Sequence, residues 1–177
     1  MAAALALLVL NSLSRAEVAC PCDMNAPETL QAPPCSLCEL AEHQPPGILF
    51  FLVKDNSPRK PNRMLALPRQ HSPGMHEMSA LPAEVRAVLW GAAIAQARER
   101  WGDQWGVAYN AERLHSQCHV HIHIGMLIEG VEAGDFMVVA GPSEIPLPGV
   151  DGLWIHGVNG KLHVHIHEQV TENVLLR

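Results

Sequence analysis

Short blocks of apolar residues alternate with polar turns along most of the chain, and one longer stretch repeats its apolar side chains with a helical period. Ile48–Lys54 and Arg63–Pro68 are apolar runs on either side of a turn region at Asp55–Asn62, and they predict two strands of a hairpin. Pro82–Trp101 has apolar residues at helical spacing and a proline that the first turn tolerates, and Gly102 follows it as a stop. This segment predicts the main helix.

Three further strands are predicted after the helix, at Trp105–Asn110, Cys118–Ile128 and Phe136–Val139. Near the end of the chain, Trp154–Val158 and Lys161–Val170 flank an Asn-Gly pair, which favours a type I′ hairpin turn. The order strand, strand, helix, strand, strand has short connections. It predicts an α+β domain with an antiparallel sheet, one main helix and a C-terminal β-hairpin.

The pattern divides the chain into four parts. Residues 1–16 contain an apolar run of nine that ends in polar and small residues, which is typical of a secretory signal peptide. Residues 17–47 form a lead-in that is rich in Pro and Cys and reads as irregular. Residues 48–145 hold the main domain, and residues 146–177 hold the histidine-rich hairpin.

The signal peptide predicts a periplasmic or secreted protein, and a buried N-terminal helix is the alternative. Val18-Ala19-Cys20 is a partial lipoprotein box, although Glu17 occupies a position where an aliphatic residue belongs. The signal peptide or a lipid anchor on Cys20 would be the part of the chain that associates with a membrane.

Composition narrows the function classes. The chain has 177 residues, of which 48% are hydrophobic, so it can bury a core. A net charge of −6 with few lysines argues against non-specific nucleic-acid binding. No apolar run reaches the roughly 18 residues of a membrane-spanning helix. Histidine is unusually frequent, with 11 residues against 12 Lys and Arg together, and six of them fall in two His-x-His-x-His tracts.

The first tract is His119, His121 and His123. On a strand, residues two apart point to the same face, so the three imidazoles are expected to project together. Such a face suits metal ligation, or chemistry in which one imidazole attacks while its neighbours orient and donate protons. An exposed strand face that happens to be rich in histidine is the alternative.

The flanks of this tract extend the pattern. Asn110 lies upstream, Gln117 stands two residues before His119, and each histidine alternates with a hydrophobic residue. This stretch resembles the signature of the histidine-triad superfamily of nucleotide hydrolases and transferases. Its compact spacing is most similar to the CDP-diacylglycerol pyrophosphatase branch, and the resemblance covers roughly residues 35–128.

The resemblance implies a role for each matching residue. His121 would be the nucleophile that attacks the α-phosphorus of a nucleotide conjugate or a nucleotide-lipid, including CDP-diacylglycerol, and forms a nucleotidyl-histidine. A backbone carbonyl can fix the tautomer that such a nucleophile needs. His123 would stabilise charge in the transition state, Gln117 would donate to the phosphate, and Asn110 would hold the ribose or phosphate. Members of the superfamily are often dimers, so a homodimer is a further expectation.

The resemblance also implies a structural Zn²⁺ site. Zinc-bearing branches bind the metal with a Cys-x-x-Cys, a histidine after the second strand and the first triad histidine. The matching residues here are Cys35, Cys38, His71 and His119. The pyrophosphatase branch lacks the Cys-x-x-Cys, so this chain combines features of two branches. In an oxidising compartment the pairs Cys20/Cys22 and Cys35/Cys38 also suit disulfides with each other, and spacing alone leaves both interpretations open.

The second tract lies in the tail hairpin. If the Asn159-Gly160 turn is type I′, His156 faces His163 and Trp154 faces His165. Four imidazoles would then share one surface suited to Zn²⁺, Cu²⁺ or Ni²⁺: His156, His163, His165 and His167. An exposed hairpin whose polar face is histidine is the alternative.

The remaining histidines, His43, His76 and His115, are expected to be ordinary surface residues.

The sequence predicts two candidate functions from different classes. The first is an exported histidine-triad hydrolase or nucleotidyl transferase, and the second is a non-catalytic periplasmic metal-binding protein that uses the His and Cys clusters.

Overall fold

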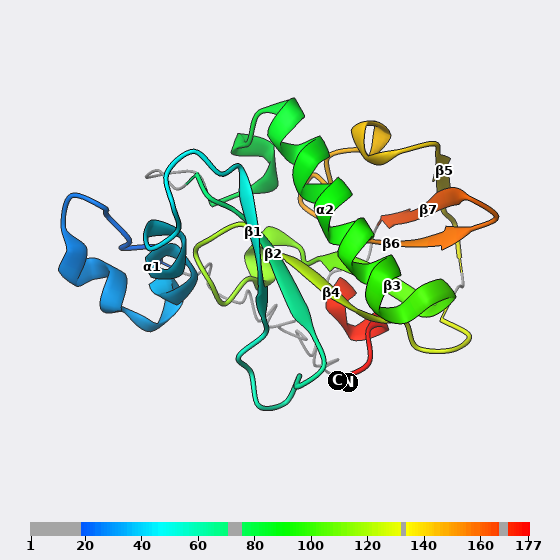
Figure 1. The fold of residues 1–177 in the computed structure, drawn as a ribbon, viewed down its shortest axis with the longest axis horizontal. Helices are drawn as coiled ribbons and strands as arrows, with labels where there is room; N and C mark the ends of the chain where they lie inside the picture. Colours follow the sequence, from blue (N-terminus) through cyan, green and yellow to red (C-terminus); the bar gives the residue numbers. More distant parts are fainter. Residues whose placement is uncertain (1–18, 71–75, 132–133, 167–169) are drawn as a thin grey trace, which may run out of the picture.

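In the part of the chain that the structure describes, seven strands form one antiparallel sheet, and a single long helix covers one of its faces (Figure 1). The computed structural model describes residues 19–70, 76–131, 134–166 and 170–177. The strands are β1 Phe50–Lys54, β2 Met64–Pro68, β3 Trp105–Tyr109, β4 Ile122–Met126, β5 Met137–Val139, β6 Leu153–Val158 and β7 Lys161–Ile166. Their order across the sheet is β1-β2-β4-β3-β6-β7-β5. The predicted α+β class with an antiparallel sheet and one main helix is confirmed.

The main helix, α2, spans Ala83–Trp101 and begins directly after Pro82, as its pattern predicts. It ends at Gly102, which has a positive φ of 55° and donates its backbone N–H to the carbonyl of Arg98. The helix packs on β2, β3 and β4 through its buried residues, which are Leu89, Trp90, Ala93, Ile94 and Ala97. None of the helices in the described ranges combines the length and apolarity that a membrane crossing requires.

Shorter helical segments connect these elements. A second α-helix, α1, spans Ser36–Glu42. The 3₁₀ turns are η1 Pro27–Gln31, η2 Pro33–Cys35, η3 Met78–Ala80, η4 Gly102–Gln104, η5 Glu112–Leu114, η6 Pro142–Glu144 and η7 Thr171–Val174.

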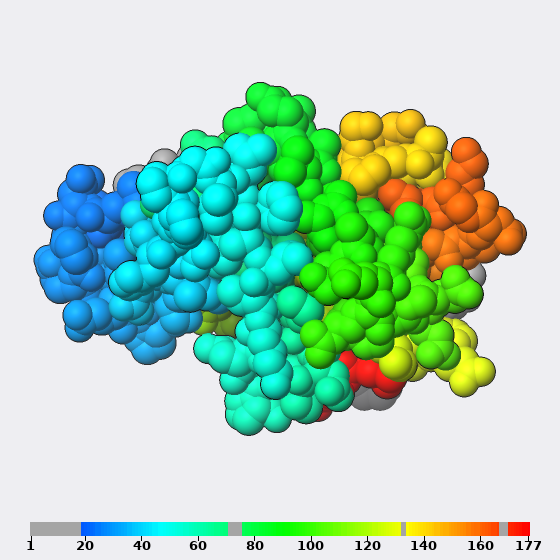
Figure 2. Space-filling view, viewed as in Figure 1, coloured from blue at the N-terminus to red at the C-terminus, as the bar shows by residue number. Residues whose placement is uncertain are grey.

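The lead-in is more regular than its composition predicts. The α1 helix buries Leu37 and Ala41 against Phe51 and Leu65, which lie on the face of β1 and β2 turned away from α2. In Figure 2 the lead-in forms the blue end of the molecule beside the cyan β1 region. The prediction of an irregular lead-in is therefore wrong. The reason is that the apolar face of α1 packs against the surface of the sheet.

The tail hairpin has the predicted turn and register. Asn159 and Gly160 have positive φ values of 51° and 79°, as a type I′ turn requires. His156 pairs with His163. The hairpin also continues the main sheet, because β6 pairs with β3. The second strand ends at Ile166 rather than Val170, and residues 167–169 lie outside the described residues.

The sheet face opposite α2 carries the unusual side chains. The strand registers align Leu65, His123, Ala108, Trp154 and His165 in one row across β2, β4, β3, β6 and β7. Neighbouring strands are about 4.8 Å apart, so directly paired residues share a face. The two histidine tracts therefore lie on the same side of the sheet.

Candidate active site

The first histidine tract lies where the chain enters β4, and the strand starts later than predicted. Pairing with β2 begins at Ile122, so a strand from Cys118 is wrong at its start. The reason is that the lead-in binds this segment instead of the sheet. The backbone N–H of Cys118 donates to the carbonyl of Pro34 at 2.8 Å, and its sulfur is bonded to Cys20. Of the three triad histidines, only His123 is in the strand.

The triad histidines are nevertheless all buried, with exposed fractions of 1%, 5% and 5% for His119, His121 and His123. The rings of His121 and His123 are 4.9 Å apart and nearly perpendicular. His121 Nδ1 donates a hydrogen bond to the carbonyl oxygen of His119 at 2.7 Å. Since a neutral imidazole carries one proton, this bond leaves the lone pair on Nε2 of His121.

His115 belongs to this cluster, although its prediction as a surface residue is wrong. The η5 turn redirects the chain so that the His115 ring lies 5.3 Å from the ring of His121 and edge-on to Tyr109. His115 Nε2 donates to the carbonyl of Asn110 at 2.9 Å. Its side chain therefore packs behind the His121 ring and holds it in place.

The other two histidines expected on the surface differ from each other. His43 is exposed, as predicted. His76 is partly buried, and its Nδ1 is hydrogen-bonded to the carbonyl of Cys118, so the prediction for His76 is wrong. This contact adds a second tie on the segment that precedes His119.

A carboxylate from the C-terminal segment completes the cluster. Glu172 accepts hydrogen bonds from Lys60 and from Arg63 Nη1, the latter at 2.6 Å. Its Oε2 atom also lies 3.6 Å from Nδ1 of His123. Among the described residues, no group comes within hydrogen-bond distance of that buried Nδ1 atom. Arg63 itself is 2% exposed, whereas the side chains of Lys60 and Glu172 are partly buried, so this is a largely buried ionic cluster beside two imidazoles.

The sheet provides a smooth surface on which the C-terminal segment docks. Gly106 of β3 and Gly125 of β4 pair directly, and Leu175 lies over both. A Cβ atom at Gly106 would lie 2.7 Å from Leu175 Cδ2, and one at Gly125 would lie 3.2 Å from Leu175 Cβ. The guanidinium of Arg63 binds the segment's carbonyls, including that of Leu176 at 2.9 Å. These contacts bring Glu172 to His123.

Burial keeps the imidazoles neutral. It lowers the pKa of His121, against the opposing effects of the His119 carbonyl and the Glu172 charge. It lowers the pKa of His123 well below the ordinary value, and the nearby charges of Lys60 and Arg63 add to the effect. Burial and the neighbouring His121 lower the pKa of His115 to about 4.

Glu172 shows the opposite balance. Burial of its carboxyl raises the pKa, but the hydrogen bond and charge of Lys60 and the charge of Arg63 together bring the pKa below the ordinary value. The site therefore joins neutral imidazoles to an ionised carboxylate that is held by two cations.

The two predicted substrate contacts are engaged within the protein. The Asn110 amide is hydrogen-bonded to Glu172 and Thr171. The Gln117 amide accepts from Ser36 Oγ at 2.8 Å and donates to the carbonyl of Pro33 at 3.2 Å. Asn110 lies at the histidine cluster, 3.5 Å from Nε2 of His123, whereas Gln117 is tied to the lead-in.

The predicted zinc ligands do not fit a metal site together. Cys35 is bonded to Cys22, and Cys20 is bonded to Cys118, so neither pairing lies within a single motif. Cys38 is a buried free thiol whose pKa is raised by burial to about 12. His71 lies outside the described residues. Because Cys35 is in a disulfide, it cannot act as a thiolate ligand in the predicted zinc site.

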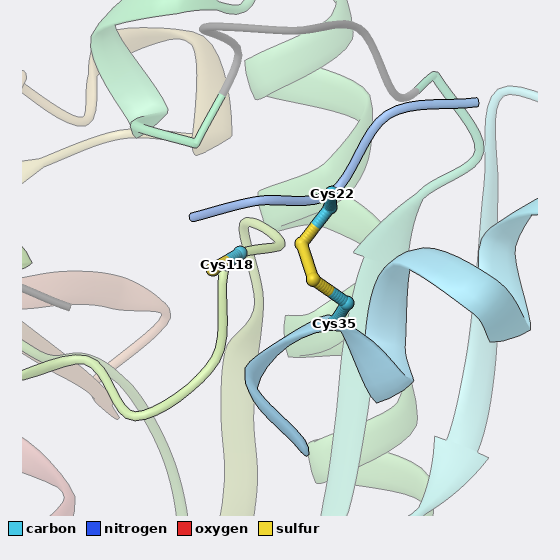
Figure 3. Close-up of side chains that lie close together, drawn as sticks. All are labelled: Cys22, Cys35 and Cys118. Carbon is cyan, nitrogen blue, oxygen red and sulfur yellow. A yellow bond between two sulfur atoms is a disulfide. The ribbon is translucent and has the colours of Figure 1, made fainter. Parts of the chain in front are cut away.

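The structure brings together a different group of sulfurs. The Sγ atoms of Cys22, Cys35 and Cys118 lie within 4.8 Å of one another, close enough to bind a metal (Figure 3). All three are buried, and two of them form the disulfide drawn in the figure.

The second tract forms a stacked cluster on β6 and β7. The ring of His165 stacks on Trp154 at 3.7 Å, and that of His163 stacks on Phe136 at 4.2 Å. The Nε2 atoms of His156 and His165 are 3.3 Å apart. Over the part of the chain that the structure describes, these histidines do not form a three-ligand group, and His167 lies outside it.

No protein-family model matches the chain, and neither a curated protein nor a solved structure matches it.

Proposed function

We propose that the chain is an exported hydrolase of the histidine-triad type that cleaves a phosphoanhydride or phosphoramidate bond of a nucleotide conjugate. The observation that carries the proposal is the hydrogen bond from His121 Nδ1 to the carbonyl of His119 at 2.7 Å. It fixes the tautomer whose Nε2 atom holds a lone pair, and burial keeps the ring neutral. A nucleophilic imidazole needs both conditions near pH 7.

In the first step Nε2 of His121 attacks the α-phosphorus of the nucleotide. The N–P bond forms as the bond from phosphorus to the leaving group breaks, and the leaving group departs with its bonding electron pair and takes up a proton. In the second step water attacks the phosphorus and loses a proton, and the N–P bond breaks. This step releases a nucleoside monophosphate and restores neutral His121.

The groups around His121 suit a phosphate. Lys60 and Arg63 supply two positive charges beside the imidazoles, where Glu172 and the buried Asp55 act as their counter-charges. A phosphate can bind these two cations in exchange for part of their present contacts. The Nδ1 atom of His123 is buried and faces this cluster. A proton on that atom can be donated to a phosphate oxygen as charge develops there. Asn110 and Gln117 remain the proposed contacts to ribose and phosphate, and each would exchange a present hydrogen bond for one to the substrate.

Two disulfides support export, because disulfides persist in oxidising compartments: Cys22–Cys35 lies within the lead-in, and Cys20–Cys118 joins the lead-in to the rest of the chain. A lipid-linked substrate such as CDP-diacylglycerol would be met at a membrane surface on that side. All of these proposed substrates contain a nucleotide.

The direct test is mass spectrometry of protein mixed with a dinucleotide or a CDP-lipid and quenched rapidly. We expect a nucleotidyl adduct on His121 and loss of turnover in His121→Ala. The control is His43→Ala, which removes an exposed histidine from the end of α1 and should leave turnover unchanged. Undiminished turnover in His121→Ala would refute the mechanism.

A second candidate function, metal binding by the tail, has one specific observation in its favour. The Nε2 atoms of His156 and His165 are 3.3 Å apart, a spacing that two imidazoles bound to one metal ion can adopt. Titration with Zn²⁺, Cu²⁺ or Ni²⁺ separates the two functions. Binding of several metal ions per chain that is lost in His165→Ala, with no effect of nucleotides on stability, would favour the metal-binding protein.

A further inference from the structure

Four of the five cysteines meet at one point, where the lead-in touches the segment before His119. Cys22, Cys35 and Cys118 have their sulfurs within 4.8 Å of one another. Cys20 is bonded to Cys118, so its sulfur is one bond from the same group. Figure 3 shows the Cys22–Cys35 bridge with Cys118 beside it on the neighbouring segment.

This arrangement is more than two unrelated bridges. Two disulfides that only staple separate parts of a fold need not touch. Here a sulfur from each bridge belongs to one buried cluster, which also contains Leu30 and the free thiol of Cys38. Cys38 is not in the group whose sulfurs lie within 4.8 Å of one another. The backbone N–H of Cys118 donates to the carbonyl of Pro34, next to Cys35, so the segments stay in register beside the sulfurs.

The distances suit a metal ion once the sulfurs are thiolates. Zn–S bonds are about 2.3 Å, so the sulfurs of a tetrahedral site are about 3.8 Å apart. Once each disulfide is reduced, its two sulfurs must separate from about 2 Å to about 3.8 Å, which is a shift of about 1 Å per sulfur. Because Cys22, Cys35 and Cys118 already have their sulfurs within 4.8 Å of one another, shifts of this size can surround one zinc ion. Cys20 is only partly buried, and its sulfur already lies against that of Cys118, so it is the nearest candidate for the fourth ligand.

We propose that Cys20, Cys22, Cys35 and Cys118 form a convertible site, which holds two disulfides when oxidised and one tetrahedral zinc ion when reduced. The site differs from the set implied by the family resemblance, because it uses neither Cys38 nor any histidine. His119 therefore stays with the imidazole cluster in both states.

The chemistry balances with a dithiol or phosphine reductant. Each disulfide takes up two electrons and two protons and gives two thiols, while a dithiol becomes a disulfide or a phosphine becomes its oxide with an oxygen from water. Binding of Zn²⁺ then displaces the four thiol protons. In both states the lead-in stays fastened to the segment that carries His119 and His121.

The test measures zinc rather than activity, so its result is separate from the fate of the proposed function. The full chain is reduced with a phosphine under anaerobic conditions, incubated with Zn²⁺, desalted and analysed for metal. We expect about one zinc ion per reduced chain and none per oxidised chain. Replacing Zn²⁺ by Co²⁺ should give the visible absorption of a tetrahedral thiolate site.

Variants and alkylation identify the ligands. Cys22→Ser and Cys118→Ser should lose zinc, whereas Cys38→Ala, which removes the buried free thiol, should keep it. In the wild-type chain, bound zinc should protect Cys20, Cys22, Cys35 and Cys118 from iodoacetamide, as read by mass spectrometry. Because this second measurement needs no variant, misfolding of a Cys→Ser chain leaves the test intact.

Two outcomes would overturn the proposal. One is a reduced wild-type chain that binds no zinc. The other is a zinc ion whose binding protects Cys38 or survives in Cys22→Ser and Cys118→Ser together.

Discussion

Asn110 and Glu172 bind each other in both directions. The Nδ2 atom of Asn110 donates to Glu172 Oε1 at 3.2 Å, and the backbone N–H of Glu172 donates to Asn110 Oδ1 at 3.0 Å. Because Asn110 directly follows β3, this pairing fastens the C-terminal segment to the sheet beside the histidines. It also sets the direction of the Glu172 carboxylate, whose other oxygen faces His123.

The Glu172→Gln variant should be strongly destabilised. It leaves the buried guanidinium of Arg63 without its carboxylate, and loss of one partner of a buried ion pair costs about 3 kcal/mol. Urea denaturation measures the free energy of unfolding. The matched control is Glu42→Gln, which breaks the more exposed pair with Arg69 and should cost at most about 1 kcal/mol. Equal losses in the two variants would contradict a special role for the buried cluster.

Stability should fall in mild acid because of His115. Its folded-state pKa is lowered to about 4, below the ordinary value of 6.5, so the unfolded chain binds a proton more readily between these values. The contribution is present above pH 6.5 and is lost as the pH falls toward 4, by about 2 kcal/mol between pH 7 and pH 5. Urea titrations of the wild type and His115→Gln at these two pH values test this. The variant should lose correspondingly less stability, and an identical loss would count against the assignment.

Catalysis should persist into acid. The pKa of His121 is lowered by burial, so the neutral nucleophile remains populated below the ordinary histidine value. The acid limb of the kcat/KM profile should therefore lie below pH 6.5. A profile that falls with a midpoint at or above that value would show that His121 is not held neutral. The dependence is measured with a nucleotide substrate whose own phosphates do not titrate in this range.

The surface of β3 and β4 on which the C-terminal segment packs should not tolerate a side chain at Gly106. In Gly106→Ala the new methyl group would lie 2.7 Å from Leu175 Cδ2 and 3.0 Å from Leu127 Cδ1. Overpacking of this kind costs about 1–3 kcal/mol, and it should increase hydrogen exchange at the Leu176 amide. Gly141→Ala is the control, because nothing lies within 4 Å of its new Cβ atom and its φ of −165° is open to any residue. Unchanged exchange in Gly106→Ala would mean that Leu175 repacks freely.

Local patterns predicted the parts of the fold that local physics determines. The α2 helix follows from apolar spacing between Pro82 and Gly102, and the His156–His163 register follows from the Asn159-Gly160 turn. The start of β4 could not be predicted in this way. The alternation around His119 is that of a strand, but the disulfide of Cys118 and its hydrogen bond to the lead-in take these residues out of the sheet.

The ionic half of the candidate site has no local signature. Arg63 and Glu172 are separated by 109 residues and meet only because the last segment crosses back over β3 and β4. Charged residues in turns and tails are ordinarily solvated, so nothing in their neighbourhoods distinguishes them. The one available signal was the pair Gly106 and Gly125, whose missing side chains indicate a close approach by another segment.

The contact of Glu172 with Arg63 and His123 also determines when the site can form during synthesis. A nascent chain that has emerged as far as β4 already carries all three triad histidines, together with Cys20 and Cys118, which are 98 positions apart. It still lacks Glu172, so Lys60 and Arg63 do not yet have the carboxylate that binds both of them. The imidazole cluster therefore reaches its final charge balance only after Glu172 has been synthesised. Until then the growing chain holds the three histidines without the ionic cluster that lies beside them.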